Sequence, residues 1–506
     1  MTTYCELLEG LPHRFIAGDP HAEVTSVVSD SRKVKPGSLF VCVKGFVTDG
    51  HDYLSSAIEK GAVAILIDEN QTKIPEPDLA SLCLRSGVSV ASSPSGRRAL
   101  AHVSARFFGM PSEKLPLYGV TGTKGKTTTT YMIRDILLAQ GLHSGLIGTV
   151  SNIVGGHAKN AERTTPESYD VQEMLDGMVK AKDDACVMEV SSQGLMLHRV
   201  YGCKFRVGAF TNLYHDHIGE HEHANMREYL DAKLLLFDSS DIGIVNLDCS
   251  VSDQVLAYAK SRCTVYTYSL EGEADVTASD LCLTTKDGRV GTEFYLRSPW
   301  FEGKLFVAMP GRFNVYNALC AAAVSGAAGI PFEAVRKGLS SVFVPGRLQS
   351  VPNTGRFHVL VDYAHNAASL ESLLTTLREY CEGRLITLFG CGGDRARSRR
   401  FEMGEVSGKM SDLTVITSDN PRSEDPTAII DDILVGFRKT SGKYLLEPDR
   451  RKAIALALSE AVPGDFVIIA GKGHENYQIF KDRTIHFDDA EEAEAILRAM
   501  QLFPEK

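Results

Sequence analysis

Residues 119–128 have the composition and spacing of a phosphate-binding loop. They read Gly-Val-Thr-Gly-Thr-Lys-Gly-Lys-Thr-Thr, after an apolar run and before a helical pattern. A strand that turns through glycines into a helix offers backbone N–H groups to an anion. Lys126 is predicted to reach the outer phosphates of a nucleoside triphosphate, and the Thr127 hydroxyl to bind the accompanying magnesium ion. The other contacts expected within the loop are Gly122, Thr123, Lys124, Gly125 and Thr128.

Glu189 is a candidate metal ligand because it ends the apolar run 185–190. The carboxyl end of a strand beside a nucleotide loop is where an open α/β sheet places a magnesium ligand. A solvated glutamate at a strand end is an equally good interpretation of this residue taken alone.

A polar stretch at 212–223 contains four histidines and three carboxylates, which suggests a metal site. It has no cysteine and no zinc-site spacing, so an exposed loop with incidental histidines is the alternative. Because a phosphate loop favours a hard cation, magnesium with one histidine ligand is preferred over zinc.

Lys233 lies among apolar residues in the helical segment 229–237. Burial there would destabilise its ammonium group and lower its pKa. A lysine that extends its charge to the surface is the simpler interpretation of the bare sequence.

Four polar motifs follow predicted strands in the last third of the chain, at 361–366, 390–395, 418–422 and 471–475. The carboxyl ends of the strands are the edge at which α/β sheets bind ligands. Any one motif could be an ordinary turn. Four charged motifs at one edge predict a cluster of ligand-facing groups that includes Arg395, Arg422 and Glu475.

Charge and cysteine content exclude several classes of protein. The net charge is −10 and the basic residues are not clustered, so we expect no nucleic-acid partner. Eleven scattered cysteines without a Cys-x-x-Cys pair are typical of reduced thiols in the cytoplasm. No segment has the pattern of a signal peptide or the length of a membrane span, so we expect a cytoplasmic protein with no membrane insertion.

The elements that must position these residues fall into three blocks. A chain of 506 residues is too long for a single core. Short strands and one clear helix occupy 1–98, strands alternate with helices over 99–344, and the alternation restarts after Pro345-Gly346. The sequence therefore predicts an α/β protein with domains at 1–98, 99–344 and 345–506, the central one built on a parallel sheet.

Several of these motifs together resemble the Mur ligase family over nearly the whole length. The resemblance rests on the phosphate loop 121–127, on Glu-Val-Ser-Ser at 189–192, on Asp-His-Ile-Gly-Glu-His at 216–221, on Ala232-Lys233 and on the segment 30–40. It implies a central P-loop ATPase-like domain that binds ATP. An N-terminal α/β domain that binds UDP-MurNAc and a C-terminal Rossmann-like domain that binds an amino acid would flank it.

The resemblance also implies roles for individual residues. Two Mg²⁺ ions would be held by Thr127, Glu189, His217 and Lys233, the lysine being carbamylated by CO₂. The catalytic set would be Lys126, Lys233, His217 and Glu189. Further ATP contacts would be Asn317, Arg347 and Asp362. The muramyl-peptide contacts would be Ser31, Thr164, Thr165, Ser191 and Arg199. The amino-acid contacts would be Arg395, Asp419, Asn420, Arg422, Gly471 and Glu475.

The chain departs from the family pattern at Lys124, Leu197, Gly219 and Ala367 and in the run 398–401. None is a proposed metal ligand, so the departures concern fine substrate contacts and not the reaction.

The implied reaction is ATP-dependent amide formation in peptidoglycan precursor synthesis. The D-glutamate side-chain carboxylate of UDP-MurNAc-L-Ala-D-Glu attacks the γ-phosphorus of ATP, which gives an acyl phosphate and ADP. The amine of the incoming amino acid then displaces phosphate. In the family the Arg form of the motif at 419–422 goes with meso-diaminopimelate, whose far carboxylate suits a guanidinium fork, whereas Arg395 and Arg422 would repel the bare ammonium of lysine.

Three alternatives stay open on the sequence. A ligase of the same family could add L-lysine or could be a folate or polyglutamate ligase. A nucleotide-driven switch or scaffold would need only the phosphate loop and would leave Lys233 unexplained. We expect small-molecule substrates as partners and a monomeric protein.

Overall fold

The computed structural model describes residues 2–45, 48–71, 75–219, 222–286 and 289–503. Contacts between Cα atoms divide the chain into two compact units. The first comprises Met1–Ala278, Leu296–Glu302 and Asn317–Gly338, and the second comprises Ser279–Tyr295, Gly303–Tyr316 and Leu339–Lys506. The domain boundaries predicted from the sequence stay a prediction. No helix within the described residues is both long and apolar enough to span a membrane.

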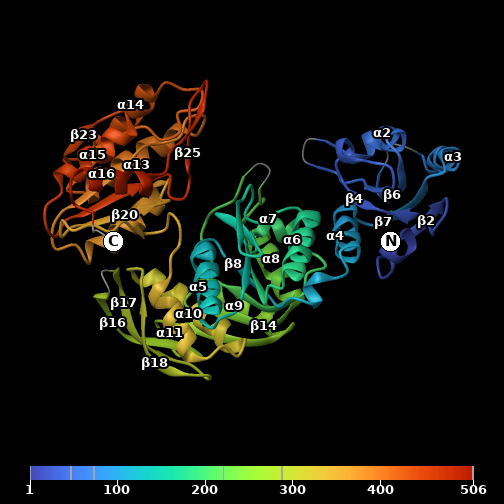
Figure 1. The fold of residues 1–506 in the computed structure, drawn as a ribbon, viewed down its shortest axis with the longest axis horizontal. Coiled ribbons are helices and arrows are strands. Elements are labelled where there is room, and N and C mark those ends of the chain that lie inside the picture. Colours follow the sequence, from blue (N-terminus) through green and yellow to red (C-terminus); the bar gives the residue numbers. More distant parts are fainter. Residues whose placement is uncertain (1, 46–47, 72–74, 220–221, 287–288, 504–506) are drawn as a thin grey trace. The chain divides into compact units, whose positions relative to one another are not determined.

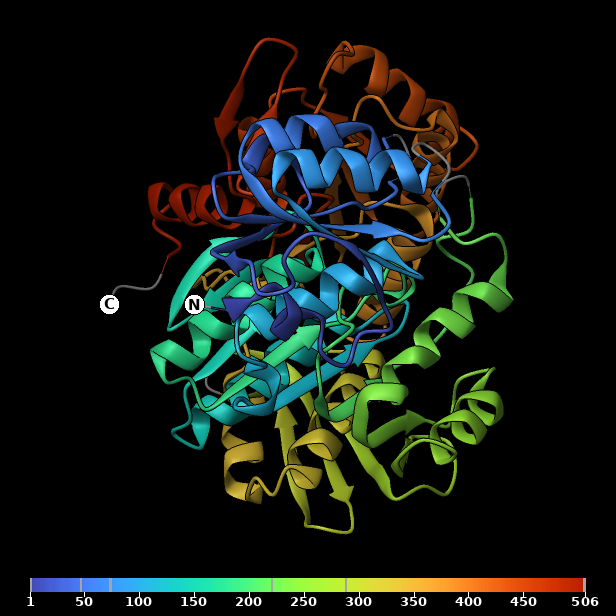
Figure 2. The same ribbon diagram turned by 90° about the vertical axis from the view of Figure 1, so that its right-hand side faces the viewer.

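A five-stranded sheet occupies the N-terminal part of the first unit (Figures 1 and 2). Its order is β2 (Arg14–Ala17), β7 (Ser89–Ser93), β6 (Ala62–Asp68), β5 (Ser38–Val41) and β4 (Ser26–Val28). All neighbouring pairs are parallel except β2 with β7.

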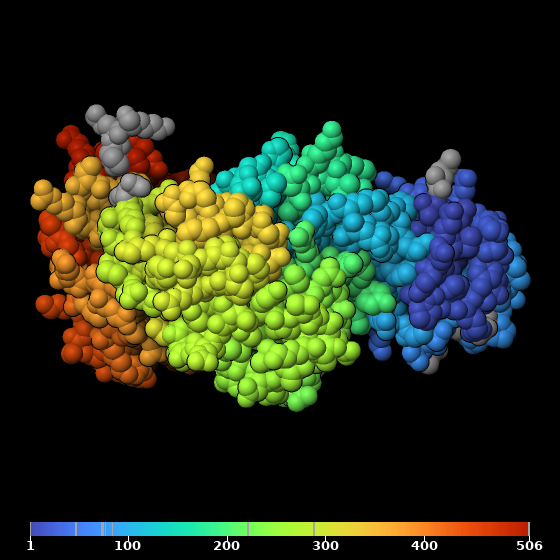
Figure 3. Space-filling model, turned by 90° about the horizontal axis from the view of Figure 1, so that it is seen from below, coloured from blue at the N-terminus to red at the C-terminus, as the bar shows by residue number. Residues whose placement is uncertain are grey.

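Helices cover both faces of this sheet. On one face α2 (Leu54–Glu59) and α3 (Glu76–Ser86) enclose a core, and on the other face α1 (Tyr4–Leu8) and α4 (Gly96–Phe107) enclose a second core. The space-filling view shows one face of this segment, in blue (Figure 3). The predicted α/β character of residues 1–98 is confirmed.

The phosphate loop follows β8 (Leu117–Thr121), a strand of the central sheet of the first unit. The parallel strands of this sheet run in the order β9 (Ser144–Ile147), β12 (Ala185–Glu189), β8, β13 (Phe205–Phe210), β14 (Ser240–Asn246) and β15 (Thr264–Ser269). α5 (Lys126–Ala139) follows β8 after the loop 122–125, as the sequence predicts (Figure 1).

The edge of the sheet beyond β9 is not parallel. β10 (Ser151–Val154) pairs antiparallel with β9 and with β11 (His157–Asn160). At its other end β15 pairs parallel with the start of β16 (Val276–Lys286). In the second unit the sheet order continues through β17 (Arg289–Arg297) and β18 (Glu302–Val307). The predicted parallel sheet is therefore correct for its centre and incomplete at its edges.

The helices of the first unit continue the alternation with strands. They are α6 (Ser168–Ala181), α7 (Ser192–Met196), α8 (Met226–Leu234), α9 (Ser252–Lys260), most of α10 (Arg312–Ala327) and part of α11 (Phe332–Ser341). Asn225 caps α8 through hydrogen bonds from the backbone N–H groups of Arg227 and Glu228, so this helix begins before the predicted segment 229–237.

A six-stranded sheet forms the centre of the second unit. Its order is β19 (Gln349–Ser350), β20 (His358–Asp362), β24 (Phe466–Ala470), β21 (Leu385–Phe389), β22 (Leu413–Ile416) and β23 (Tyr444–Leu446). Only β19 is antiparallel to its neighbour. The four strands predicted to precede the four polar motifs are all present, as β20, β21, β22 and β24.

Five helices and a hairpin complete the second unit: α12 (Ala367–Arg378), α13 (Arg397–Met410), α14 (Pro426–Phe437), α15 (Arg450–Glu460), α16 (Asp489–Ala499) and the pair β25 (Tyr477–Ile479) with β26 (Thr484–His486). Ala367 is the first residue of α12, after the cap Asn366. Alanine forms helices well at such a position, so the departure at 367 leaves the helix start intact.

Candidate functional site

The phosphate loop connects β8 to α5 through two glycines with positive φ. Gly125 (φ 85°) directly precedes α5, and Gly122 has φ 146°. A Cβ atom on Gly122 would lie 1.9 Å from Thr211 Oγ1. Only glycine fits there, for two reasons. A side chain would clash with Thr211 at the end of the neighbouring strand, and a residue with a Cβ atom would be strained at this positive φ.

Lys126 and Thr127 occupy the positions expected of phosphate and metal contacts. The Lys126 ammonium lies across its own loop and donates to the carbonyls of Gly122 (2.9 Å) and Thr123 (3.1 Å). The Thr127 hydroxyl donates to Glu189 Oε2 at 2.9 Å. The structure thus joins the first turn of α5 to the end of β12.

Glu189 is buried, with 1% of its surface exposed, so the interpretation as a solvated strand-end residue is wrong. Thr149 donates to its Oε1 from the backbone N–H (2.8 Å) and to its Oε2 from the hydroxyl (3.0 Å). With Thr127, three donors fix the carboxylate. The sequence did not single out Thr149, because its contact with Glu189 depends on β9 lying beside β12.

Lys233 is 1% exposed, so the simpler interpretation of a lysine that reaches the surface is also wrong. Its Nζ donates to the carbonyl of Gly122 at 2.8 Å and lies 4.5 Å from the centre of the Tyr229 ring. Burial, followed by the nearby charge of Lys126, lowers the pKa of Lys233 well below its usual value. A neutral amine at the phosphate loop is a nucleophile that can take up CO₂.

Tyr229 is a further contact of the loop that the sequence did not predict. Its hydroxyl hydrogen-bonds to Thr123 Oγ1 at 3.1 Å, and burial raises its pKa to about 12. The ring of His217 lies 5.8 Å away and that of His223 lies 5.0 Å away. Tyr229 therefore connects the loop, Lys233 and the histidine-rich segment.

His217 is held at the surface of this segment. It has φ 56°, and its Nδ1 lies 3.2 Å from Glu222 Oε1. No hydrogen bond or ion pair among the described residues joins it to Thr127 or Glu189. Glu220 and His221 of the same motif lie outside the described residues.

The oxygen donors at the loop suit magnesium. Thr127 and Glu189 offer a hydroxyl and a carboxylate, the hard ligands that Mg²⁺ prefers. Among the described residues, no group of three or more histidine, cysteine, aspartate or glutamate side chains is placed to hold a metal ion. The preference for magnesium over zinc stays a prediction.

Lys124, a departure from the family pattern, is paired within the loop. Its Nζ lies 3.6 Å from Asp216 Oδ2, and its backbone N–H donates to Asn212 Oδ1 at 2.8 Å. Its charge is thus partly compensated at an exposed position, where such pairs contribute little energy.

Asn317 lies against the loop from α10. A Cβ atom on Gly125 would be 2.4 Å from Asn317 Oδ1, and the same oxygen accepts a hydrogen bond from the Thr129 hydroxyl at 3.4 Å. The structure places Asn317 beside the glycine that precedes α5, and its predicted contact with ATP stays a prediction.

Four of the predicted muramyl-peptide residues are brought together beside Glu189. Thr165 Oγ1 donates to the Glu189 carbonyl (2.9 Å) and accepts from the Ser191 backbone N–H (3.0 Å). Arg199 donates to the Thr165 carbonyl at 3.1 Å, and the Thr164 hydroxyl lies 3.1 Å from that of Thr149. The buried Nε of Arg199 has no partner among the described residues.

Ser31 is the member of that set that is not joined to the others. It starts a 3₁₀ helix (Ser31–Lys33), and its carbonyl accepts a hydrogen bond from Lys60 at 2.8 Å. Within the described chain no hydrogen bond links it to the four residues beside Glu189.

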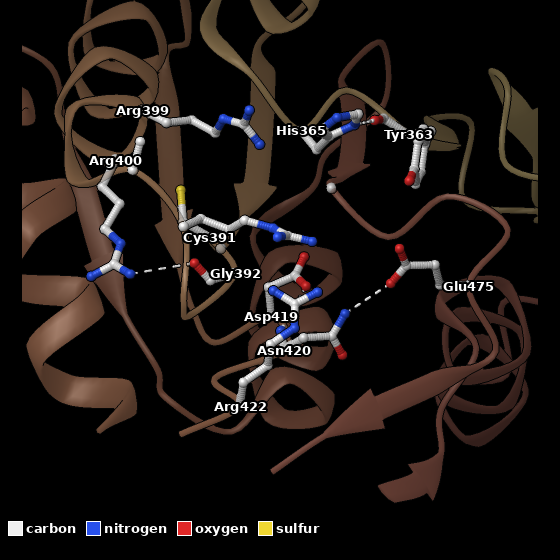
Figure 4. Close-up of a pocket in the computed structure, with 14 residues that line it drawn as sticks. Tyr363, His365, Cys391, Gly392, Arg399, Arg400, Asp419, Asn420, Arg422 and Glu475 are labelled. Atoms are coloured by element: carbon white, nitrogen blue, oxygen red, sulfur yellow. Dashed lines mark hydrogen bonds between the residues drawn. The ribbon is translucent and has the colours of Figure 1, made fainter. Parts of the chain in front are cut away.

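A pocket in the second unit lies at the carboxyl ends of its central strands (Figure 4). Its lining includes all six predicted amino-acid contacts: Arg395, Asp419, Asn420, Arg422, Gly471 and Glu475. Tyr363, His365 and Arg399 also line it and were not selected from the sequence. The first two belong to a motif that follows β20, so strand-end position was the signal that could have found them.

The pocket has cationic and anionic sides. The guanidinium of Arg422 donates to the Gly393 carbonyl at 2.7 Å, and the backbone of Arg422 has φ 52°. Arg395 makes no side-chain hydrogen bond or ion pair to another described residue, so its charge is available to a ligand. Asp419 and Glu475 are carboxylates of the same lining, and burial raises the pKa of Glu475.

Arg347 and Asp362, the predicted ATP contacts of the last block, are near each other within the second unit. Asp362 accepts hydrogen bonds from the backbone N–H groups of Leu348 and Ala364, both at 2.9 Å. The Arg347 guanidinium stacks 4.5 Å from the centre of the Tyr363 ring. Asp362 therefore shapes the turn that carries Arg347, and the ATP contacts themselves stay a prediction.

Comparison with known proteins gives consistent matches along the chain. Residues 23–108 match the family described as "Mur ligase family, catalytic domain", residues 120–325 match "Mur ligase middle domain", and residues 346–473 match "Mur ligase, glutamate ligase domain". A relative from Clostridium acetobutylicum, UDP-N-acetylmuramoyl-L-alanyl-D-glutamate–2,6-diaminopimelate ligase 1, is 42% identical over 489 residues. The match covers 96% of this chain and 97% of the relative.

Solved structures agree with these matches. A structure of a UDP-N-acetylmuramoyl-L-alanyl-D-glutamate–2,6-diaminopimelate ligase has a TM-score of 0.72 at 28% identity, and the match covers 99% of each chain. The MurF ligase from Thermotoga maritima in complex with ADP has a TM-score of 0.58 at 17% identity, covering 94% of this chain and 97% of that one, which supports the fold.

Proposed function

Since this chain belongs to the Mur ligase family, we propose that it is the ATP-dependent ligase that joins meso-diaminopimelate to UDP-MurNAc-L-Ala-D-Glu. The observation that carries the proposal beyond the family is the pocket of the second unit. Its lining includes Arg395 and Arg422 as well as Asp419 and Glu475, which suits a substrate with both carboxylate and ammonium groups.

The first step activates an acid. The D-glutamate side-chain carboxylate of the substrate attacks the γ-phosphorus of ATP, and the bond to the ADP oxygen breaks. The loop amides before α5 and the Lys126 ammonium stabilise the negative charge that moves toward ADP. The products of this step are ADP and an acyl phosphate.

The second step forms the amide. The neutral amine of the amino acid attacks the acyl carbon, phosphate leaves, and the amine loses a proton. Groups of the second-unit pocket hold the amino acid by its other charged groups, so that the reacting amine stays free. Exclusion of water protects the acyl phosphate from hydrolysis.

Thr127, Glu189, His217 and the carbamylated Lys233 are the residues that would hold two Mg²⁺ ions. When bound, the ions supply charge compensation for the triphosphate and the substrate carboxylate. Three donors already orient Glu189, so this carboxylate needs little rearrangement to act as a ligand.

Selectivity for meso-diaminopimelate over L-lysine follows from the guanidinium groups. A fork such as Arg422 can bind the far carboxylate with two hydrogen bonds, whereas lysine brings only an ammonium group to the same position. A site built around a polar substrate group rejects an analogue without it by about 10⁴–10⁵, because its own groups are left unpaired.

The test is phosphate release by the purified protein with ATP, magnesium and UDP-MurNAc-L-Ala-D-Glu. We expect release with meso-diaminopimelate and none above background with L-lysine. Release with lysine alone would keep the ligase and contradict the selectivity. Release with a folate or with neither amino acid would contradict the proposed function.

Arg422→Ala tests the assignment of the selectivity group in the same assay. We expect the KM for meso-diaminopimelate to rise by about tenfold to a hundredfold, the worth of one charge-assisted contact, with the KM for ATP unchanged. Arg438→Ala, at an exposed arginine just after α14, is the control. An unchanged KM for diaminopimelate would show that Arg422 does not bind the substrate.

A further inference from the structure

Lys472 is a fully buried lysine at the edge of the amino-acid pocket, for which the proposed reaction gives no role. It lies between Gly471 and Gly473, directly after β24. Its ammonium is within hydrogen-bond reach of Asn420 Oδ1 (3.4 Å) and Glu475 Oε2 (3.5 Å), and it also donates to the Tyr477 carbonyl. Three N–H donors thus have three acceptors, and two of the acceptors belong to residues that line the pocket.

These contacts fix the orientation of Asn420. Its Oδ1 accepts from the Ile479 backbone N–H at 2.9 Å as well as from Lys472, so the other end of the amide must be the donor. That Nδ2 group donates to Glu475 Oε2 at 2.8 Å (Figure 4). Lys472, Asn420 and Glu475 therefore form a closed triangle of hydrogen bonds.

The hydrogen bonds of the triangle involve only one carboxylate oxygen of Glu475. Both Asn420 and Lys472 bind Oε2, whereas Oε1 accepts no hydrogen bond within the described part of the chain. Glu475 lines the pocket, so this oxygen is available to a ligand there.

The charge of Glu475 is under opposing influences. Burial raises its pKa, and the like charge of Asp419 acts in the same direction. Lys472 is the cation in contact with it, and the Glu475 charge also interacts with that of Arg450. Tyr363 and Tyr477 are neutral neighbours, whose pKa values are raised by burial and then by the charge of Glu475. Without Lys472, a buried carboxyl beside another carboxylate would take up a proton more readily.

We propose that Lys472 is a positioning residue for the amino-acid substrate, which holds Glu475 as an anion with Oε1 turned into the pocket. There Oε1 accepts a hydrogen bond from an ammonium group of the substrate other than the reacting amine. This inference rests on the proposed function, because it takes the pocket as the amino-acid site.

Lys472→Met tests the inference, since methionine keeps the volume and removes the charge. We expect the KM for meso-diaminopimelate to rise by about tenfold or more. A factor of that size corresponds to a rise of roughly one unit in the pKa of Glu475, or to the loss of one charge-assisted contact with the substrate. The KM values for ATP and the UDP-linked substrate are expected to stay unchanged. Lys481→Met, at an exposed lysine beyond β25, is the matched control.

The pH profile separates this role from a structural one. In Lys472→Met the carboxyl of Glu475 should be protonated at higher pH than in the parent. The excess KM for diaminopimelate is therefore largest at low pH and shrinks as pH rises. A variant that merely disturbs packing would raise KM by the same factor at every pH.

A double-mutant cycle with Glu475→Gln completes the test. Glutamine cannot titrate, so Lys472→Met should add no pH-dependent effect in that background. If Lys472→Met does not fold, as judged by circular dichroism, Lys472→Gln keeps two donors without the charge and should show the same pH dependence with a smaller rise in KM.

The outcomes distinguish the two proposals. A parent protein that releases no phosphate with diaminopimelate contradicts the proposed function itself. An active parent whose Lys472 variants keep the parental KM at all pH values overturns the inference and leaves the function intact. A pH-independent rise in KM also overturns it, in favour of a packing role.

Discussion

At the scale of single residues, Glu189 and Lys233 share one property: burial decides their chemistry. Each is 1% exposed, and each contacts the strand–loop–helix unit that begins at β8. Glu189 accepts three hydrogen bonds, whereas the partners of Lys233 within the described residues are the Gly122 carbonyl and the Tyr229 ring. Since a ring and one carbonyl compensate a buried ammonium poorly, the neutral amine is favoured and is open to carbamylation.

We expect Lys233 to carry a carbamate, because its lowered pKa supplies the neutral amine that attacks CO₂. The measurement is carbon NMR of the protein equilibrated with ¹³C-bicarbonate. A carbamate signal should be present in the parent and in Lys180→Ala, whose lysine is exposed, and absent in Lys233→Ala. Lys233→Ala should also lose about 10²-fold or more in kcat, the scale of a lost group that stabilises transition-state charge. The same signal in Lys233→Ala would place the carbamate elsewhere.

At the scale of elements, the loop between β8 and α5 is set by close approach as well as by backbone conformation. Gly122 packs on Thr211 at the end of β13, the strand next to β8 in the sheet. Gly125 packs on Asn317 of α10. The loop therefore lies between β13 and α10, which are far apart in the sequence, and its shape depends on how these two elements pack against it.

Gly122→Ala should weaken ADP binding by about one to two powers of ten, because strain of about 1–3 kcal/mol must be relieved by displacing the loop. Gly141→Ala is the control, since Gly141 also has positive φ (87°) but nothing lies within 4 Å of an added Cβ. We expect that control to keep its affinity for ADP. Calorimetric titration of the magnesium complex of ADP checks both, and equal affinities would contradict the account of the loop.

At the scale of the whole molecule, buried charged and titratable groups tie stability to pH. Arg450 and Asp489 form a fully buried ion pair, and Arg450 also donates to the carbonyls of Ser418 and Ala470, which directly precede pocket residues. His474 carries a buried Nδ1 without a partner among the described residues, and its ring lies 4.9 Å from that of Tyr363. Burial, then Arg347 and His365, lowers the pKa of His474 to about 4.

The free energy of unfolding should fall as pH drops from about 6.5 to about 4 because of His474. Over that range the unfolded chain takes up a proton at this residue and the folded chain does not. The contribution is at most about 3 kcal/mol, from roughly 2.5 units of pKa. Urea unfolding of the parent and of His474→Gln at several pH values checks it, with His143→Gln at an exposed histidine as the control. Parallel pH profiles for the parent and His474→Gln would contradict the assignment.

Features that depend on neighbours along the chain could be predicted from the sequence. The turn 122–125, the start of α5 and the strands of the last block are encoded in short runs of glycine, threonine and apolar residues. Strand ends carry the polar motifs, so a cluster that includes Arg395, Arg422 and Glu475 could also be predicted, and all three line the pocket. The resemblance to the Mur ligases depended on these same local patterns.

Which polar groups are buried, and which partners they have, depends on how the elements pack against one another. Thr149 reaches Glu189 because β9 and β12 are adjacent, and Lys233 is buried because α8 packs its face toward the loop. Lys472 reads in the sequence as part of a glycine-rich turn, yet its ammonium lies between Asn420 and Glu475. The physical reason is that desolvation and hydrogen bonding depend on contacts between distant segments, which a local pattern does not contain.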